Sequence, residues 1–228
     1  METSFRTSRP QRYLYAMVEG LPGWWRPPRE GVGAGAVTAR PVRDLFLIAS
    51  PIVSPPGRTP GAQARHHDVV GSLLEATSVV PFRFATVVPE MDIDGWLDAR
   101  MPLIRTSLAE VRGCVEMTVR LLRLDPRIER SPGANGVAGF LRIVADRLIE
   151  RAGLPNWRYC PTGSGGNAAA SLAFLVPRAD ISVFLAHIAP IAARAEGVAV
   201  VPTGPWPPYS FLAALERETA PTAGSVSA

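Results

Sequence analysis

The second half of the chain sets out an order of structural elements that few folds accommodate. Apolar residues alternate with polar ones in Cys114–Leu124, which predicts a strand, and recur at helical spacing in Val137–Ala152. Two strands, a helix and a last strand follow, with expected bounds Asn156–Gly163, Ala168–Pro177, Asp180–Glu196 and Val198–Gly204. This β-α-β-β-α-β order predicts a ferredoxin-like antiparallel sheet with two helices on one face.

The first half predicts a related α/β unit. Aromatic and β-branched runs between Gly- and Pro-rich loops predict strands, with expected bounds Tyr13–Val18, Ala36–Val42, Leu45–Ser50 and Val79–Val88. Apolar residues at helical spacing predict a helix over Gln63–Thr77. The following segment, 91–111, is expected to be helical in pieces around Pro102, with Asp92 or Asp94 as its N-cap.

The length and composition suit two such units. A chain of 228 residues with 47% hydrophobic content can bury a substantial core. We therefore predict an α+β protein with an N-terminal α/β domain at 1–111, a C-terminal ferredoxin-like domain at 112–215 and a disordered tail at 216–228. No apolar run approaches the roughly 18 residues of a membrane span, and no apolar stretch follows the N-terminal arginines, so a cytoplasmic protein is expected.

The positive charge is carried by arginine alone. The net charge is +4 and the pI about 9.7, but 20 acidic residues are interspersed among 24 basic ones, and the sequence contains no lysine. It shows no basic stripe and no RNA-binding aromatic signature. We therefore expect no nucleic-acid partner, and keep a nucleic-acid-binding protein as the third hypothesis for function.

His66 and His67, followed by Asp68, are the leading candidates if the chain is an enzyme. Successive helical residues point about 100° apart, so the two imidazoles cannot share one metal ion without distortion. A packing or surface role is the favoured interpretation. We expect no catalytic residue, and a small cytoplasmic enzyme using either histidine is the alternative hypothesis.

Two other features give no sign of a cofactor. The cysteines, Cys114 and Cys160, lie far apart without metal-ligand spacing and are expected to be buried and inert. The glycine-rich stretch Thr162–Ala170 lacks the Lys and Ser/Thr of a phosphate-binding loop and runs into a strand, so it is interpreted as a hairpin turn. No cofactor and no metal are expected.

The closing stretch TGPWPPYSF, Thr203–Phe211, places three prolines and a glycine around Trp206. Two of the prolines have the P-x-x-P spacing of a polyproline II ligand for an aromatic groove. Prolines also stiffen the backbone, and these directly follow a predicted core strand, so a rigid architectural strap is the favoured interpretation. It predicts that Trp206 is buried against the second sheet or at the domain boundary, with Tyr209 and Phe211 beside it. An exposed Trp206 would favour recognition.

Four stretches, taken in order, resemble the gas-vesicle accessory proteins of the GvpF/GvpL type. They are YLYAMV, the His66–His67 helix leading into VVPFRFATVV, RGCVEMTVRL and the closing TGPWPPYSF. The resemblance covers about Tyr13 to Leu212, and GPWPPYSF is its most specific element. Ala85 stands where the family usually has glycine after P-x-R-F.

The resemblance implies a non-enzymatic assembly or minor structural protein of the gas vesicle. Such a protein is expected to bind the hydrophobic shell protein and other accessory proteins in the cytoplasm, covering apolar or edge surface before the shell polymerises. The candidate structural or interaction residues are Pro81, Phe82, Arg83, Phe84, Trp206, Pro207, Pro208, Tyr209 and Phe211. An open sheet edge or a Trp/Pro surface would serve as the contact.

Overall fold

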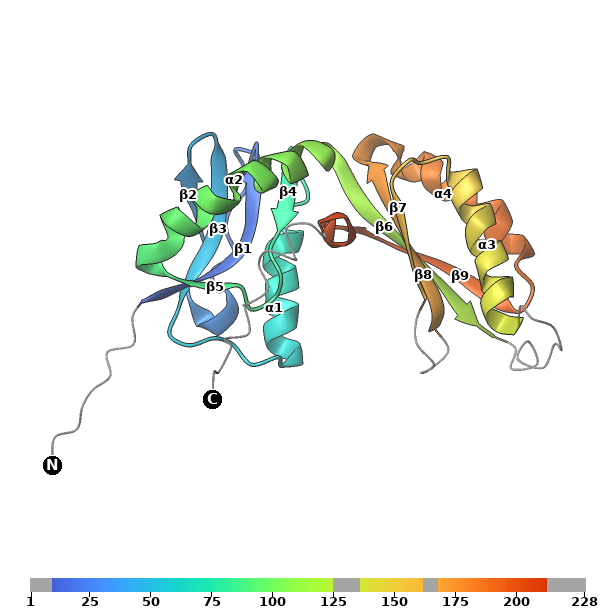
Figure 1. Ribbon diagram of the computed structural model, residues 1–228, viewed down its shortest axis with the longest axis horizontal. Helices are drawn as coiled ribbons and strands as arrows, with labels where there is room; N and C mark the ends of the chain where they lie inside the picture. Colours follow the sequence, from blue (N-terminus) through green and yellow to red (C-terminus); the bar gives the residue numbers. More distant parts are fainter. Residues whose placement is uncertain (1–9, 125–135, 162–167, 213–228) are drawn as a thin grey trace, which may run out of the picture. The chain divides into compact units, whose positions relative to one another are not determined.

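The computed structural model describes residues 10–124, 136–161 and 168–212, and these fall into two compact units (Figure 1). The first unit comprises the residues up to Arg112 together with Leu212, and the second runs from Gly113 to Phe211. Each unit has its own antiparallel sheet with helices, which confirms the predicted α+β class. The expected tail at 216–228 and the centre of the glycine-rich turn, 162–167, lie outside the described residues.

The second unit has the predicted order of elements. Its strands are β6 (Cys114–Arg123), β7 (Trp157–Pro161), β8 (Ala168–Pro177) and β9 (Val198–Trp206). Its helices are α3 (Gly136–Ala152) and α4 (Ile181–Arg194), with 3-10 turns η4 (Arg178–Asp180) and η5 (Tyr209–Phe211). The strand order is β7-β8-β6-β9, every pair is antiparallel, and both helices cover the same face (Figure 1). This is the ferredoxin-like arrangement.

The alternation in β6 explains how this unit forms its core. Met117, Val119 and Leu121 point to the helical face and are buried there with the apolar stripes of α3 and α4. Phe174 of β8 and Phe184 of α4 pack with ring centroids 5.2 Å apart. The alternate residues of β6 therefore face the other side of the sheet.

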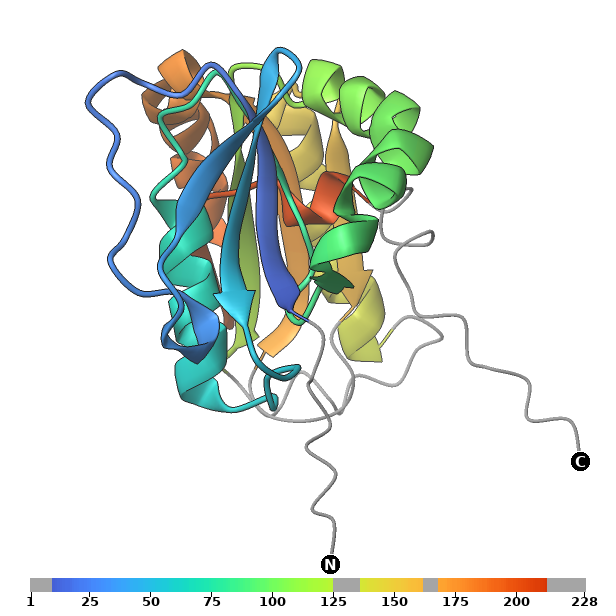
Figure 2. The same ribbon diagram turned by 90° about the vertical axis from the view of Figure 1, so that its left-hand side faces the viewer.

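The first unit is a five-stranded sheet between two helices. Its strands are β1 (Gln11–Glu19), β2 (Thr38–Val42), β3 (Leu45–Ile52), β4 (Ser78–Pro81) and β5 (Val87–Pro89). Its helices are α1 (Pro60–Gly71) and α2 (Ile93–Glu110), with 3-10 turns η1 (Val32–Ala34) and η2 (Glu90–Asp92). The strand order is β2-β3-β1-β4, and β5 also pairs with β1. Because α1 and α2 lie on opposite faces (Figure 2), the central run of β1 is buried on both sides and consists of aliphatic residues and tyrosines.

Three predicted elements of the first unit were wrong in detail. The strand predicted over Val79–Val88 is split into β4 and β5, because residues 82–86 turn out of the ladder. The helix predicted to break at Pro102 is one continuous helix, α2, since a proline removes a single hydrogen bond while the buried face of the helix holds both halves. Helix α1 ends at Gly71, six residues before the predicted Thr77. None of the described helices is both long and apolar enough to cross a membrane.

Candidate interaction sites

Trp206, in the closing stretch, is exposed. It is the last residue of the outer strand β9, 49% of its surface is accessible, and its indole N–H donates to the Thr203 hydroxyl at 3.3 Å. The prediction that Trp206 would be buried was therefore wrong. The pairing of β9 with β6 is irregular here, with a register shift between Glu116 and Thr118, and the indole stays accessible to solvent.

The residues that follow Trp206 form a rigid, mostly buried base. Pro207, Pro208 and Phe211 are buried and Tyr209 is half-buried. The Tyr209 and Phe211 N–H groups donate to the carbonyls of the two prolines, at 2.8 and 3.2 Å, and close the 3-10 turn η5. The Arg158 guanidinium lies 5.1 Å from the centre of the Phe211 ring. The strap interpretation thus describes residues 207–211, while Trp206 projects from the strap.

A buried carboxylate that the sequence analysis missed, Glu116, holds this base in place. Glu116 is 7% exposed and accepts hydrogen bonds from the Ser210 N–H at 2.9 Å and the Ser210 hydroxyl at 2.8 Å. Burial raises the pKa of this carboxyl group, and the bonds from Ser210 partly oppose the shift. In the sequence, Glu116 stands at an alternating strand position typical of a solvated face, so no local signal indicated its burial.

The P-F-R-F motif of the first unit lies where the chain leaves β4. Pro81 and Phe82 are buried, Arg83 is exposed and Phe84 is half-buried. The Phe82 ring packs edge-on against Trp96 of α2, with centroids 5.5 Å apart. Phe82 is therefore a core residue, and Arg83 and Phe84 are the members of this group that a partner can reach.

His66 lies fully buried beneath the same loop and links it to β1. Its Nδ1 is 2.9 Å from the Tyr13 hydroxyl, and the ring also hydrogen-bonds to the Phe82 backbone. Burial, and then the charge of His67, lowers the pKa of His66 to about 4, so the ring is neutral at pH 7. The neutral ring donates one hydrogen bond to the Phe82 carbonyl, so its other nitrogen, Nδ1, accepts a hydrogen bond from the Tyr13 hydroxyl. The Tyr13 oxygen in turn accepts a hydrogen bond from the Ala85 N–H at 3.0 Å.

This hydrogen-bonded series gives His66 a structural role. Both of its ring nitrogens are engaged and its surface is inaccessible, which removes His66 as a catalytic base in the alternative hypothesis. His67, the next residue of α1, is exposed. Among the residues that the structure covers, no three His, Cys, Asp or Glu side chains are grouped to hold a metal ion.

Both cysteines were predicted to be buried, and this prediction was wrong. Cys160, on the outer strand β7, is exposed, and Cys114 is half-buried.

Ala85 takes a left-handed conformation, with φ of 68°. A Cβ atom strains this conformation by about 1–2 kcal/mol, whereas glycine adopts it freely at the cost of a more flexible unfolded chain. We expect Ala85→Gly to raise the free energy of unfolding by about 1 kcal/mol, measured by urea denaturation. Ala64→Gly, at an exposed interior position of α1, is the matched control and should lower it by about 1 kcal/mol. A loss of stability in both variants would show that Ala85 is unstrained.

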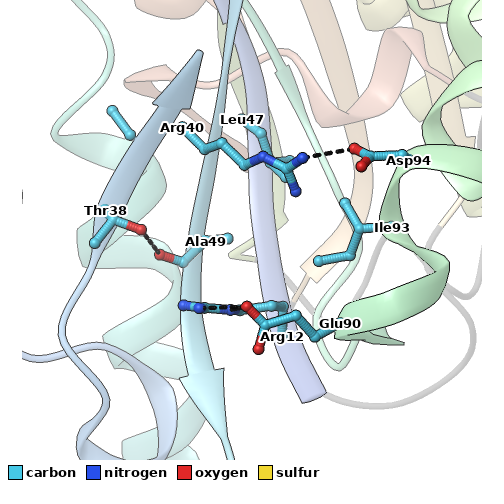
Figure 3. Close-up of a pocket in the computed structure, with 9 residues that line it drawn as sticks. Arg12, Thr38, Arg40, Leu47, Ala49, Glu90, Ile93 and Asp94 are labelled. Carbon is cyan, nitrogen blue, oxygen red and sulfur yellow. Dashed lines mark hydrogen bonds and ion pairs between the residues drawn. The ribbon is translucent and has the colours of Figure 1, made fainter. Parts of the chain in front are cut away.

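An open pocket of about 580 Å³ lies between β2 and the start of α2 (Figure 3). Two ion pairs flank it, Arg12 with Glu90 and Arg40 with Asp94, each at 2.7 Å. The apolar part of the lining is Ala39, Leu47, Ala49 and Ile93. Because each guanidinium is matched by a carboxylate, the pocket has no excess charge with which to select an ion, and such exposed pairs contribute at most about 1 kcal/mol each.

Comparison with known proteins identifies the relatives of this chain. The family model described as gas vesicle synthesis protein GvpL/GvpF matches residues 11–153 and 141–213. Gas vesicle protein F2 of Halobacterium salinarum is 27% identical over 186 residues, which cover 78% of this chain and 82% of that protein. Gas vesicle protein L2 of the same organism is 26% identical over 193 residues, covering 64% of this chain and 68% of that protein.

Two crystal structures share the fold. Gas vesicle protein GvpF from Anabaena sp. PCC7120 superposes with a TM-score of 0.74 at 15% identity, covering 89% of this chain and 96% of that one. Gas vesicle protein GvpF from Microcystis aeruginosa superposes with a TM-score of 0.69 at 13% identity, covering 89% and 98%. At these identities the likeness establishes a common architecture.

Proposed function

This chain belongs to the GvpL/GvpF family of gas vesicle synthesis proteins, and from that premise we propose that it binds the hydrophobic shell protein and other accessory proteins while the vesicle forms. Membership of the family supports a role in gas vesicle assembly. The main support for the proposal is that the match to the family extends over both structural units. We place the protein in the cytoplasm beside the growing vesicle, as an assembly or minor structural component without catalytic activity.

Trp206 offers the contact that such a role needs. A shell subunit that polymerises must have its apolar or edge surface covered until it is incorporated. Trp206 is an exposed residue at the end of the outer strand of the second sheet, and it directly precedes the base of residues 207–211, which Glu116 holds through Ser210. A side chain presented from a rigid base loses little conformational entropy on binding, and tryptophan is among the commonest residues at binding hot spots. We propose Trp206 as the anchor of the contact with the shell protein.

Trp206→Ala is the direct test of this proposal. Loss of a hot-spot side chain costs at least about 2 kcal/mol, so capture of purified shell protein should weaken about 30-fold or more, while the melting temperature changes by only a few degrees. Trp24→Ala is the matched control, because Trp24 is also exposed, at 65%, and lies in the first unit. We expect that variant to bind as the unchanged chain does.

The possible failures are distinguishable. Equal capture by Trp206→Ala and the unchanged chain would exclude Trp206 as the anchor and leave the binding function standing. Absence of capture by the unchanged chain, with folded shell protein at micromolar concentration, would overturn the proposed function itself.

A further inference from the structure

Helix α4 has the composition of a helix that is covered on two sides. Its sequence, ISVFLAHIAPIAAR, contains no acidic residue, and Arg194 is its one arginine. Phe184 and Ile188 face the core of the second unit. The opposite face is exposed and includes two polar residues, Ser182 and His187, but most of its residues are small and apolar, namely Val183, Ala186, Ala189, Pro190 and Ala193. A surface helix ordinarily carries charged and polar side chains on its outer face, so this face has the character of a contact surface.

A groove that could hold part of a partner lies beside this face. It has a volume of about 550 Å³ and lies between α3 and the end of α4. Its apolar lining is Phe140, Ile143, Val144, Ile191 and Ala195. Ile143 is 52% exposed and Val183, further along α4, is 51% exposed. Large aliphatic side chains are thus left in water on the outer side of both helices, while their inner sides are already packed on the sheet.

The charged residues around the groove favour a partner that carries negative charge. Arg147 of α3 and Arg194 of α4 line it, and Glu196 is the acidic lining residue. Arg142, also on α3, pairs with Asp146 at 2.9 Å. Neither Arg147 nor Arg194 forms an ion pair with a carboxylate in the parts of the chain that the structure describes. A partner with carboxylates beside its apolar stripe would therefore supply the opposite charge.

We propose that the α3/α4 groove docks an amphipathic helix from a partner protein, whose apolar stripe lies on Ile143 and Ile191 and whose flanking Asp or Glu side chains pair with Arg147 and Arg194. Helix-in-groove binding uses apolar anchors at helical spacing, and charge on the rim sets the specificity. This contact is separate from the one at Trp206, so it gives an assembly protein a second docking surface.

A pair of synthetic helical peptides tests the proposal. Both carry the same leucine stripe, one flanked by glutamates and the other by lysines, and their binding to the full-length chain is measured by fluorescence anisotropy. The acidic peptide should bind at least tenfold more tightly than the basic one. The double variant Arg147→Glu, Arg194→Glu should reverse that preference, and Ile143→Ser should weaken the tighter complex about tenfold. Arg58→Glu, at an exposed position in the first unit, is the control and should change neither affinity.

Three outcomes would overturn the proposal. Equal binding of the two peptides would show that the arginines do not select the partner. No binding of the acidic peptide, in a chain that still captures shell protein, would remove this docking surface and leave the proposed function intact. Self-association that Ile143→Ser abolishes would assign the groove to a second copy of this chain.

Discussion

Acidification from pH 6.5 to pH 4 is expected to lower the free energy of unfolding of the first unit by about 3 kcal/mol through His66 alone. The pKa of His66 is lowered from 6.5 to about 4 in the folded protein. Well above pH 6.5 the ring is neutral in both the folded and the unfolded state and contributes no pH dependence. Below pH 6.5 the unfolded chain binds a proton that the folded chain does not, so stability falls until the folded protein also takes up the proton near pH 4.

The loss has a structural cause in the hydrogen bonds of the ring. Neutral His66 accepts from the Tyr13 hydroxyl, which in turn accepts from the Ala85 N–H. Protonation turns Nδ1 into a donor that faces another donor and places a charge in a site that excludes water. The loop at residues 82–86 should therefore be the first part of this unit to lose its packing in acid.

His66→Asn supplies the comparison, because asparagine keeps an acceptor near Nδ1 and does not titrate. Urea denaturation of the first unit is measured at intervals from pH 7 to pH 4 in both proteins. The carboxylates that titrate in this pH range are present in both proteins, so their contributions cancel when the two pH profiles of stability are subtracted. The unchanged chain should lose about 3 kcal/mol more than the variant over this range. Parallel pH profiles would show that His66 has an ordinary pKa and that the buried hydrogen-bonded series does not control acid stability.

The sequence predicted the second unit closely, for a reason visible in its periodicity. Each predicted strand and helix there begins and ends within two residues of the observed element, from Cys114–Arg123 to Val198–Trp206. In these segments the apolar residues recur with a period of two in the strands and of 3.6 in the helices, and glycines and prolines separate one segment from the next. In the first unit, the break at residues 82–86 has no such signal, because VVPFRFATVV is apolar and β-branched almost throughout. It is the buried His66 and Tyr13 beneath the loop that hold it out of the ladder.

The candidate residues were harder to place, since their environment depends on partners distant in sequence. Trp206 was predicted to be buried from its neighbours alone, whereas its exposure follows from its position at the end of the outer strand β9. Glu116 is buried by Ser210, 94 residues along the chain. His66 is paired with Tyr13, which is 53 residues away. No local pattern encodes such pairings, so single-sequence reasoning identifies the motif but not which of its side chains face solvent.

Phe82→Ala is expected to have the largest effect of any substitution in the P-F-R-F motif, lowering the free energy of unfolding of the first unit by roughly 3–5 kcal/mol. The Phe82 ring is buried against Trp96, and the Arg100 guanidinium lies 4.4 Å from the centre of the Trp96 ring on α2. Removing the ring leaves a cavity that these neighbours cannot fill without moving α2 toward the sheet. The Phe82 N–H still donates to the Tyr15 carbonyl in the variant, so the loss comes from packing.

Arg83→Ala is the neighbouring comparison, because an exposed side chain contributes less than about 1 kcal/mol to stability. Urea denaturation gives the stability of both variants, and capture of shell protein is measured at a temperature where each is folded. If Phe82 acts through the core, Phe82→Ala should capture the shell protein normally once it is folded and fail only when it unfolds. A folded Phe82→Ala protein that has lost capture would instead make Phe82 part of the contact, which requires the loop at residues 82–86 to open when the partner binds.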